Sequence, residues 1–305
     1  MADFRTLADA GVAAPFPKLR ALVSKMKARQ QEILDLIHDD EEPPESLPFI
    51  GRFRDNRNVN AIANDIEATL QLPLARRERL NNNASLLRLI RNSAEEAGIY
   101  VLAQGDMGSH HSDISPSEFR GFALADPIAP FIVLNDNDAK AAQTFTLIHE
   151  LAHLWIGDTG VSNYDPFDSG EGSDEERFCN KVSAEFLMPQ ESITRSWLAY
   201  QDFSLANAVQ IIAKNFGVSR AAVAHRLWKL NTIEDAQWWG LYRGYKREWD
   251  TIKAAQKISD NTPPLYYPTK KSQLGGKLIR TVLSAVRRSV VAGFLGLAGA
   301  AVMAP

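Results

Sequence analysis

The central part of the chain carries an apolar stripe at helical spacing, which predicts one long helix. The stripe consists of Phe145, Ile148, Ala152 and Trp155. The polar run Asn135–Asp138 stands before it and offers N-capping side chains, and Gly157 follows as a residue that can end a helix with a positive φ. Polar residues beside this stripe would line the wall of a cleft.

Three short apolar runs before this helix have the length and the β-forming residues of strands. They are Ile99–Ala103, Phe119–Ala125 and Phe131–Leu134. We expect a small three-stranded sheet, and we place an edge that pairs with an extended substrate at Phe131, Val133 and Asn135. The alternative for this last run is an ordinary core strand.

The first 57 residues predict a helical lead-in followed by an acidic linker. Leu19, Leu22, Met26 and Ile33 indicate an amphipathic helix, and the run from Asp39 to Pro44 ends it. Basic residues between the apolar ones are typical of a solvated face, although such a helix can also contact DNA or a membrane. Two further helices are expected near residues 58–73 and 85–97, inside a core that spans residues 58–203.

Residues 204–232 predict a helix-turn-helix-like unit, with helices near 205–215 and 220–230. Gly217 falls in the turn and Ser219 is an N-cap. Basic side chains on the second helix would allow DNA binding, while the net charge of −3 argues against it. The unit would otherwise pack on the core or dock a partner.

The remaining residues, 233–305, predict a helical C-terminal region with a connector near 259–276. A series of Trp and Tyr residues from Trp238 to Trp249 is typical of a packed helix. The run Val290–Ala304 is apolar but shorter than the roughly 20 residues that span a bilayer. We therefore expect a packed or self-associating C-terminal helix rather than a membrane anchor.

The composition indicates a soluble protein in a reducing compartment. Hydrophobic residues make up 45% of the chain and charged residues 23%, as in globular proteins. The single cysteine excludes an internal disulfide, and the N-terminus shows no signal-peptide pattern. We expect a cytoplasmic protein.

The predicted central helix contains the motif His149-Glu150-Leu151-Ala152-His153. Residues four apart lie on one face of a helix, so His149 and His153 can offer two imidazoles to one metal ion. Glu150 is close enough to act as the general base on a water, which is the arrangement that a zinc peptidase needs. The competing interpretation is a pair of packed histidines beside an exposed Glu150.

A third metal ligand should lie in the helix predicted after residue 174. Glu176 is our choice, because two His and one Glu form a known catalytic zinc set. Glu175 and Glu185 are the alternatives, and an acid in the first turn is otherwise explained by the helix dipole. Cys179 could approach the metal, but it is more typical of a small buried apolar residue.

Two loops carry further candidate residues. His110 and His111 could stabilise the transition state or contact substrate, or they could be ordinary surface residues. The Gly- and Asp-rich loop from Gly157 to Asp174 could cover the cleft, or it could be an acidic surface loop.

The segments around the two motifs resemble the ImmA/IrrE metallopeptidase family. The resemblance rests on Phe145–Leu154, on Glu176-x-x-Cys179-Asn180 and on the run Ala184–Pro189, and it covers roughly residues 98–232. It implies a mainly helical, zincin-like α+β fold, Zn²⁺ held by His149, His153 and Glu176, and Glu150 as general base. Many relatives carry an N-terminal DNA-binding domain that we do not find in this sequence.

The resemblance also implies a biological role. Family members often cleave a helix-turn-helix repressor, which relieves repression of phage, mobile-element, defence or stress genes. We therefore expect a zinc-dependent endopeptidase whose substrate is a separately encoded repressor. The alternative is a non-catalytic regulator that binds a repressor, or that binds DNA through residues 205–230.

Overall fold

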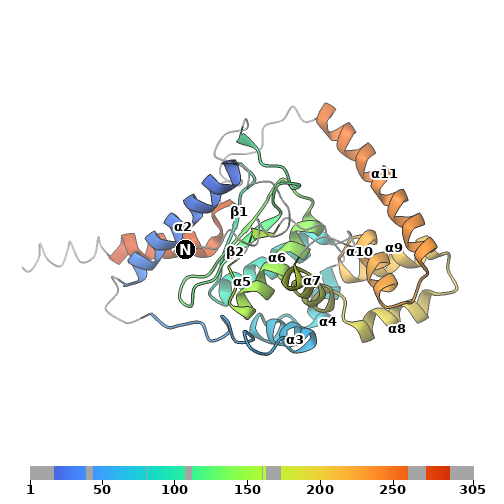
Figure 1. Cartoon of the computed structure of the whole chain (residues 1–305), viewed down its shortest axis with the longest axis horizontal. Coiled ribbons are helices and arrows are strands. Elements are labelled where there is room, and N and C mark those ends of the chain that lie inside the picture. Colours follow the sequence, from blue (N-terminus) through green and yellow to red (C-terminus); the bar gives the residue numbers. More distant parts are fainter. Residues whose placement is uncertain are drawn as a thin grey trace, which may run out of the picture.

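A computed structural model shows a small sheet enclosed by helices (Figure 1). His110, His111 and the run Val290–Ala304 lie outside the described residues. The structure describes residues 17–38, 44–80, 82–106, 112–159, 161–162, 173–259 and 273–288.

The sheet contains the three predicted strands and one short addition. The strands are β1 (Tyr100–Ala103), β2 (Gly121–Leu124), β3 (Phe131–Leu134) and β4 (Val161–Ser162). Their order is β1-β3-β2-β4, with β1 parallel to β3 and β2 antiparallel to both β3 and β4. The mainly helical α+β fold is confirmed, whereas the two residues of β4 are too few to produce a recognisable pattern.

The expected substrate edge at Phe131, Val133 and Asn135 is wrong. Strand β3 lies inside the sheet and is paired on both sides, so it has no free edge. Phe131 and Val133 are fully buried, and the Asn135 side chain donates to the carbonyl oxygens of Ile114 and Phe119, at 3.0 Å each. A continuous apolar run is typical of a strand buried on both faces, which is the alternative given above.

Each face of the sheet supports its own apolar core. Alternate side chains such as Val101 and Ile132 pack with the central helix α6 (Lys140–Ile156) and with α5 (Asn83–Glu96). The opposite face packs with α2 (Pro17–His38) and with Leu278 in a helix at residues 276–288. Helix α2 therefore forms part of the core rather than a separate lead-in.

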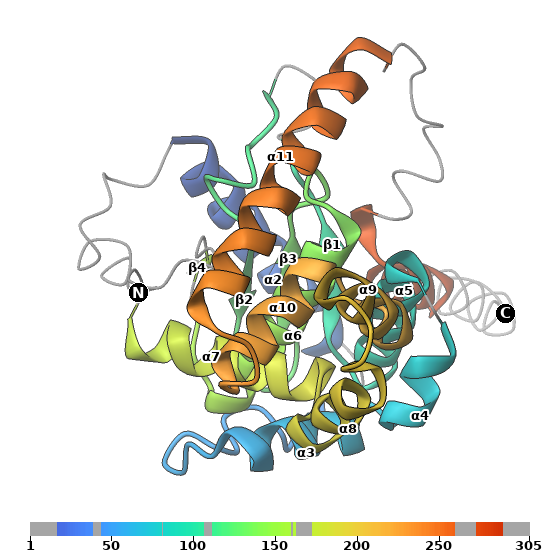
Figure 2. The same ribbon diagram turned by 90° about the vertical axis from the view of Figure 1, so that its right-hand side faces the viewer.

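Helices occupy most of the other positions where the pattern predicted them, including residues 58–73, 85–97, 205–215 and 220–230. Helix α11 runs along the outside of the molecule (Figure 2). The remaining bounds are α3 Val59–Thr69, α4 Leu74–Arg77, η1 Glu78–Leu80, α7 Asp174–Leu187, α8 Gln190–Tyr200, α9 Leu205–Phe216, α10 Arg220–Lys229 and α11 Asp235–Ser259.

Helix α6 begins differently from the prediction. Its N-cap is Ala139, which makes no capping hydrogen bond through its side chain. The expected capping residues are engaged elsewhere: Asn137 donates to the Gly105 carbonyl at 2.8 Å, and Asp138 pairs with Arg120 at 3.0 Å. Since residues 146–156 are buried all round, α6 is a central helix and does not carry a single buried stripe.

The C-terminal end of α6 is held by the segment at residues 47–54. The amides of Gly51 and Phe53 donate to the carbonyls of Leu154 and Trp155, both at 2.9 Å. These bonds satisfy acceptors that a helix end leaves without partners. Gly157 ends the helix at φ +74°, as predicted, and a Cβ on it would lie 2.9 Å from the Cα of Gly51.

The helix-turn-helix-like unit is attached to the body through its basic side chains. Arg226 donates to the Met188 carbonyl at 3.2 Å and pairs with Glu185, both at the C-terminal end of α7. Arg220 pairs with Glu248 of α11, and the ring of His225 lies 5.2 Å from that of Trp238. The second helix of the unit therefore packs against α7 and α11.

Within the described residues, no helix is both long and apolar enough to cross a bilayer.

We predict that Gly157→Ala lowers the free energy of unfolding by about 1–3 kcal/mol. The substitution places a side chain at positive φ and against the backbone of Gly51, which cannot move without loosening the end of α6. Chemical denaturation followed by circular dichroism measures the loss. Gly240→Ala is the matched control, since a Cβ there meets nothing within 4 Å and alanine favours the helix. Equal losses in the two variants would contradict the prediction.

Candidate metal centre

Helix α6 presents the two histidines of the motif side by side. His149 and His153 are 3% and 1% exposed, and their Nε2 atoms are 3.1 Å apart. Their rings lie one turn apart on the same face, as the spacing predicts. Two ring nitrogens therefore meet at one buried point.

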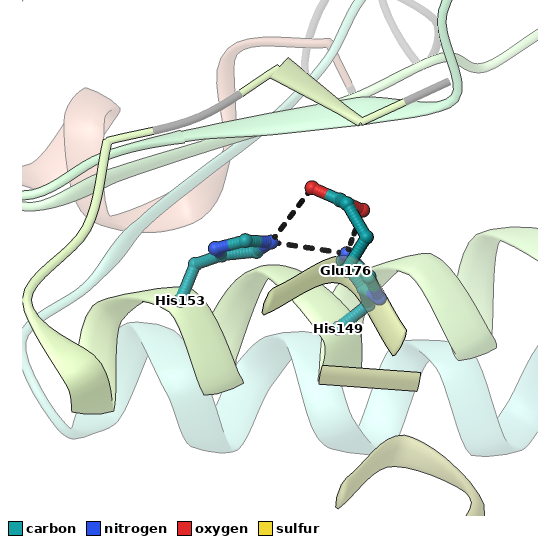
Figure 3. A group of neighbouring side chains, drawn as sticks. All are labelled: His149, His153 and Glu176. Carbon is teal, nitrogen blue, oxygen red and sulfur yellow. Dashed lines mark hydrogen bonds and ion pairs between the residues drawn. The ribbon is translucent and has the colours of Figure 1, made fainter. Parts of the chain in front are cut away.

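Helix α7 brings Glu176 to the same point (Figure 3). The Ser173 hydroxyl caps the helix by accepting from the Glu176 amide at 3.2 Å, which fixes the first turn. Glu176 Oε2 lies 3.0 Å from His149 Nε2, and Oε1 lies 3.3 Å from His153 Nε2. The carboxylate thus faces both imidazoles.

Both imidazoles have a polar partner on the outer nitrogen. His149 Nδ1 lies 2.9 Å from Asn180 Oδ1, and His153 Nδ1 lies 3.5 Å from Asp158 Oδ2. Asn180 Oδ1 accepts a hydrogen bond from His149, whereas Asp158 is within ion-pair distance of His153; with a metal ion at Nε2, each ring would carry its proton on Nδ1. The lone pair of each Nε2 then points towards Glu176.

This arrangement fits a metal ion. Two imidazole lone pairs and a carboxylate converge in a buried space, where they repel each other unless a cation lies between them. A tetrahedral site with metal–ligand distances of about 2.0–2.1 Å needs neighbouring ligand atoms about 3.3 Å apart. The observed separations of 3.0, 3.1 and 3.3 Å are close to that value.

The electrostatics of Glu176 agree with a ligand role. Burial alone would raise the pKa of this carboxyl, but without a metal ion, protonated His149 and His153 donate hydrogen bonds and supply positive charge that outweigh burial and hold the pKa well below its usual range. Glu176 is therefore ionised at neutral pH, as a metal ligand must be.

Each of the two alternative acids forms an ion pair with an arginine. Glu175 lies one residue earlier in α7 and pairs with Arg57 at 3.3 Å. Glu185 is at the other end of that helix and pairs with Arg226. Neither belongs to the group formed by His149, His153 and Glu176.

A second group of potential ligands overlaps the first. His153, Asp158 and Glu175 offer atoms that lie within 4.8 Å of one another. It shares His153 with the first group, and its Asp158 already serves as the outer partner of that ring. The first group is the better site, because its ligand atoms are closer together and more deeply buried.

Glu150 is fully buried between α6 and the sheet. Its Oε1 would lie 3.2 Å from a Cβ on Gly121 of β2, and Thr146 of α6 would lie 2.6 Å from the same point. Glycine at position 121 therefore permits the close approach of helix and strand that holds Glu150. The competing interpretation of the motif, with an exposed Glu150, is excluded.

Cys179 lies in the same helix as Glu176 and is fully buried. Burial raises the pKa of its thiol, which disfavours the thiolate that binds metals. The interpretation as a small buried residue is the better one.

The outer partners were not recognised from the sequence. Asn180 stands four residues after Glu176, so the two share one face of α7, and this spacing could have identified it. Asp158 directly follows the glycine that ends α6, and no local pattern marks it as a partner of His153.

We predict that Glu176→Ala weakens zinc binding by more than the tenfold to hundredfold that removal of an outer partner typically causes. Glu175→Ala is the matched control and should bind zinc nearly as the wild type does, since its carboxylate faces Arg57. Competition with a chromophoric chelator gives both affinities. The reverse ranking would move the third ligand to Glu175.

A second prediction concerns Asn180. Replacement by alanine removes the acceptor that fixes the His149 ring, and zinc affinity should fall by about 10- to 100-fold. Asn60→Ala, at an exposed position of α3, should leave the affinity unchanged. Wild-type affinity in a folded Asn180→Ala variant would show that the hydrogen bond does not orient the ligand.

Comparison with known protein families identifies a similarity in the central part of the chain. No curated protein matches it. Residues 80–228, which contain both motif helices and the three longer strands, match the Peptidase_M78 family, described as an IrrE N-terminal-like domain. This agrees with the resemblance seen in the sequence and with a metallopeptidase-type site that could bind a metal ion. Residues 80–228 therefore form a domain of the Peptidase_M78 type.

Proposed function

We propose that this protein is a zinc-dependent endopeptidase. The observation that carries the proposal is the convergence of His149, His153 and Glu176, with ligand atoms 3.0–3.3 Å apart, together with the fully buried Glu150, which directly follows His149 in α6. Two imidazoles, one carboxylate and a neighbouring base are the set that zinc peptidases use. When bound, zinc would supply a Lewis acid that polarises a carbonyl and acidifies water.

Proton transfer and the orientation of the metal ligands are assigned to residues of the chain. Glu150 would accept a proton from the attacking water and deliver it to the departing amine, since a carboxylate within reach of both atoms can serve as base and then as acid. Asn180 would hold the His149 ring by a hydrogen bond, and the charge of Asp158 would favour a proton on His153 Nδ1, so that each Nε2 faces Glu176. His110 and His111 remain candidates for contacts with the transition state.

We further propose that the substrate is a separately encoded helix-turn-helix repressor and that its cleavage relieves repression in the cytoplasm. Transcription regulation and stress or defence responses would then be the setting. This part rests on the resemblance to the ImmA/IrrE family.

A binding role without catalysis is the alternative function. DNA binding through residues 205–230 is disfavoured, because Arg220 and Arg226 form ion pairs with Glu248 and Glu185. A protein that binds the repressor without cleaving it would not need Glu150 as a general base, whereas a peptidase would.

Glu150→Gln decides between these functions. The amide keeps the size of the side chain but cannot accept a proton, so we expect unchanged zinc content and a loss of cleavage of at least 100-fold, in line with the roughly 10²–10⁴-fold contribution of general bases. Proteins captured by the Glu150→Gln variant from the native host would be identified by mass spectrometry and incubated with the wild type.

Glu175→Gln provides the matched control, because it makes the same chemical change one residue away from a proposed ligand. Cleavage of a captured protein by the wild type and by Glu175→Gln, but not by Glu150→Gln, supports the enzyme. Capture without any cleavage by zinc-loaded wild type favours the binding protein. Loss of zinc from Glu150→Gln would instead indicate that Glu150 is a ligand.

A further inference from the structure

The helix at residues 276–288 is fixed to the body at its N-terminal end. The Glu95 carboxylate accepts from the amides of Gly276 and Lys277, at 3.0 and 3.1 Å, and so caps the helix from α5. Leu278 is buried against the sheet, and the Thr281 hydroxyl lies 3.1 Å from that of Tyr100. The first turns of this helix are therefore well anchored, beside α5 (Figure 2).

The following turns expose an apolar stripe. Val282, Leu283 and Val286 are 40%, 50% and 53% exposed, although large apolar side chains are normally buried. Their spacing places them on one side of the helix, next to the half-buried Ile279. The described part of the chain leaves this stripe open to solvent.

Cations border the stripe. Arg280 and Arg287 are seven residues apart, so they lie on the same side of the helix next to the apolar residues. The Arg280 side chain is 64% exposed, with its guanidinium 4.0 Å from the Glu95 carboxylate. From residue 261 to residue 305 the sequence contains no aspartate or glutamate, although the whole chain has a net charge of −3. Its cations in this stretch are Lys270, Lys271, Lys277, Arg280, Arg287 and Arg288.

Three occupants of the stripe can be compared by charge. A second copy of the helix would bring its own arginines close to these, and like charges repel. Nucleic acid would engage the cations but would gain nothing from Val282, Leu283 and Val286. The surface of an anionic bilayer matches both features, because acyl chains take up the apolar side chains and headgroup phosphates attract the cations.

We propose that the helix at residues 276–288 docks this protein on an anionic membrane surface. It would lie in the plane of the interface, with Val282, Leu283 and Val286 in the acyl region and the arginines at the headgroups. This role is independent of the proposed peptidase activity, and it differs from a membrane-spanning anchor.

The test is co-sedimentation of the full-length, zinc-loaded protein with vesicles of phosphatidylcholine, with and without phosphatidylglycerol. We expect binding to the phosphatidylglycerol vesicles only, and weaker binding at high salt. The triple variant Val282→Ser, Leu283→Ser, Val286→Ser should bind at least about 100-fold more weakly, since each apolar side chain contributes to insertion. Arg287→Gln with Arg288→Gln should lower binding about tenfold or more.

Matched controls separate this surface from general effects. Leu198→Ser with Phe203→Ser changes two other exposed apolar residues, 59% and 53% exposed, and should leave vesicle binding unchanged. Arg243→Gln with Lys246→Gln removes two exposed charges from α11 and should also have little effect. Circular dichroism and zinc content establish that each variant is folded.

Several outcomes would overturn the proposal. Equal binding to both kinds of vesicle, binding that survives in the triple variant, or no binding at all would each do so. A dimer in light scattering that the triple variant abolishes, without vesicle binding, would assign the stripe to a second copy. Binding to duplex DNA that depends on the arginines but not on the stripe, without vesicle binding, would assign the cations to nucleic acid.

Discussion

The rest of the structure depends on the close approach of two imidazole nitrogens and one carboxylate in a buried space. Polar atoms that accept hydrogen bonds but face one another are unfavourable inside a protein unless a cation or a proton lies between them. His149 and His153 come from a single helix, whereas Glu176 comes from another. The fold must therefore hold α6 and α7 in a fixed relation over the whole length of their contact.

Contacts outside the site supply this relation. Arg77 is 2% exposed and donates to the Leu72 carbonyl at 3.0 Å and to the carbonyl of Phe186 in α7. Arg226 reaches the same helix end from the helix-turn-helix-like unit. Carbonyls at a helix C-terminus attract cations, so two guanidinium groups hold α7 in place. The unit that resembles a DNA-binding motif thereby contributes to the architecture of the site.

The sequence predicted the parts of this molecule that local patterns encode. Helical spacing identified α6 and its two histidines, and strand length identified β1 to β3. The position of Asp158 beside His153 could not be predicted, because it depends on the path of the chain after Gly157. The predicted N-cap of α6 was wrong for a related reason. Asn137 and Asp138 are residue types that often cap helices, but here their side chains bond to distant segments. Likewise, an apolar run such as β3 does not reveal whether it lies at an edge or inside a sheet.

The sheet also separates two regions of the surface. Helix α6, with the candidate metal centre, packs on one face, whereas α2 and the helix at residues 276–288 pack on the other. Glu95 links these layers, because it belongs to α5 and caps the helix at residues 276–288. Docking through Val282, Leu283 and Val286 would thus place the membrane on the opposite side of the sheet from His149 and His153. A substrate could then reach the centre without competing with the bilayer for the same face, so membrane attachment and peptide cleavage are compatible in one chain.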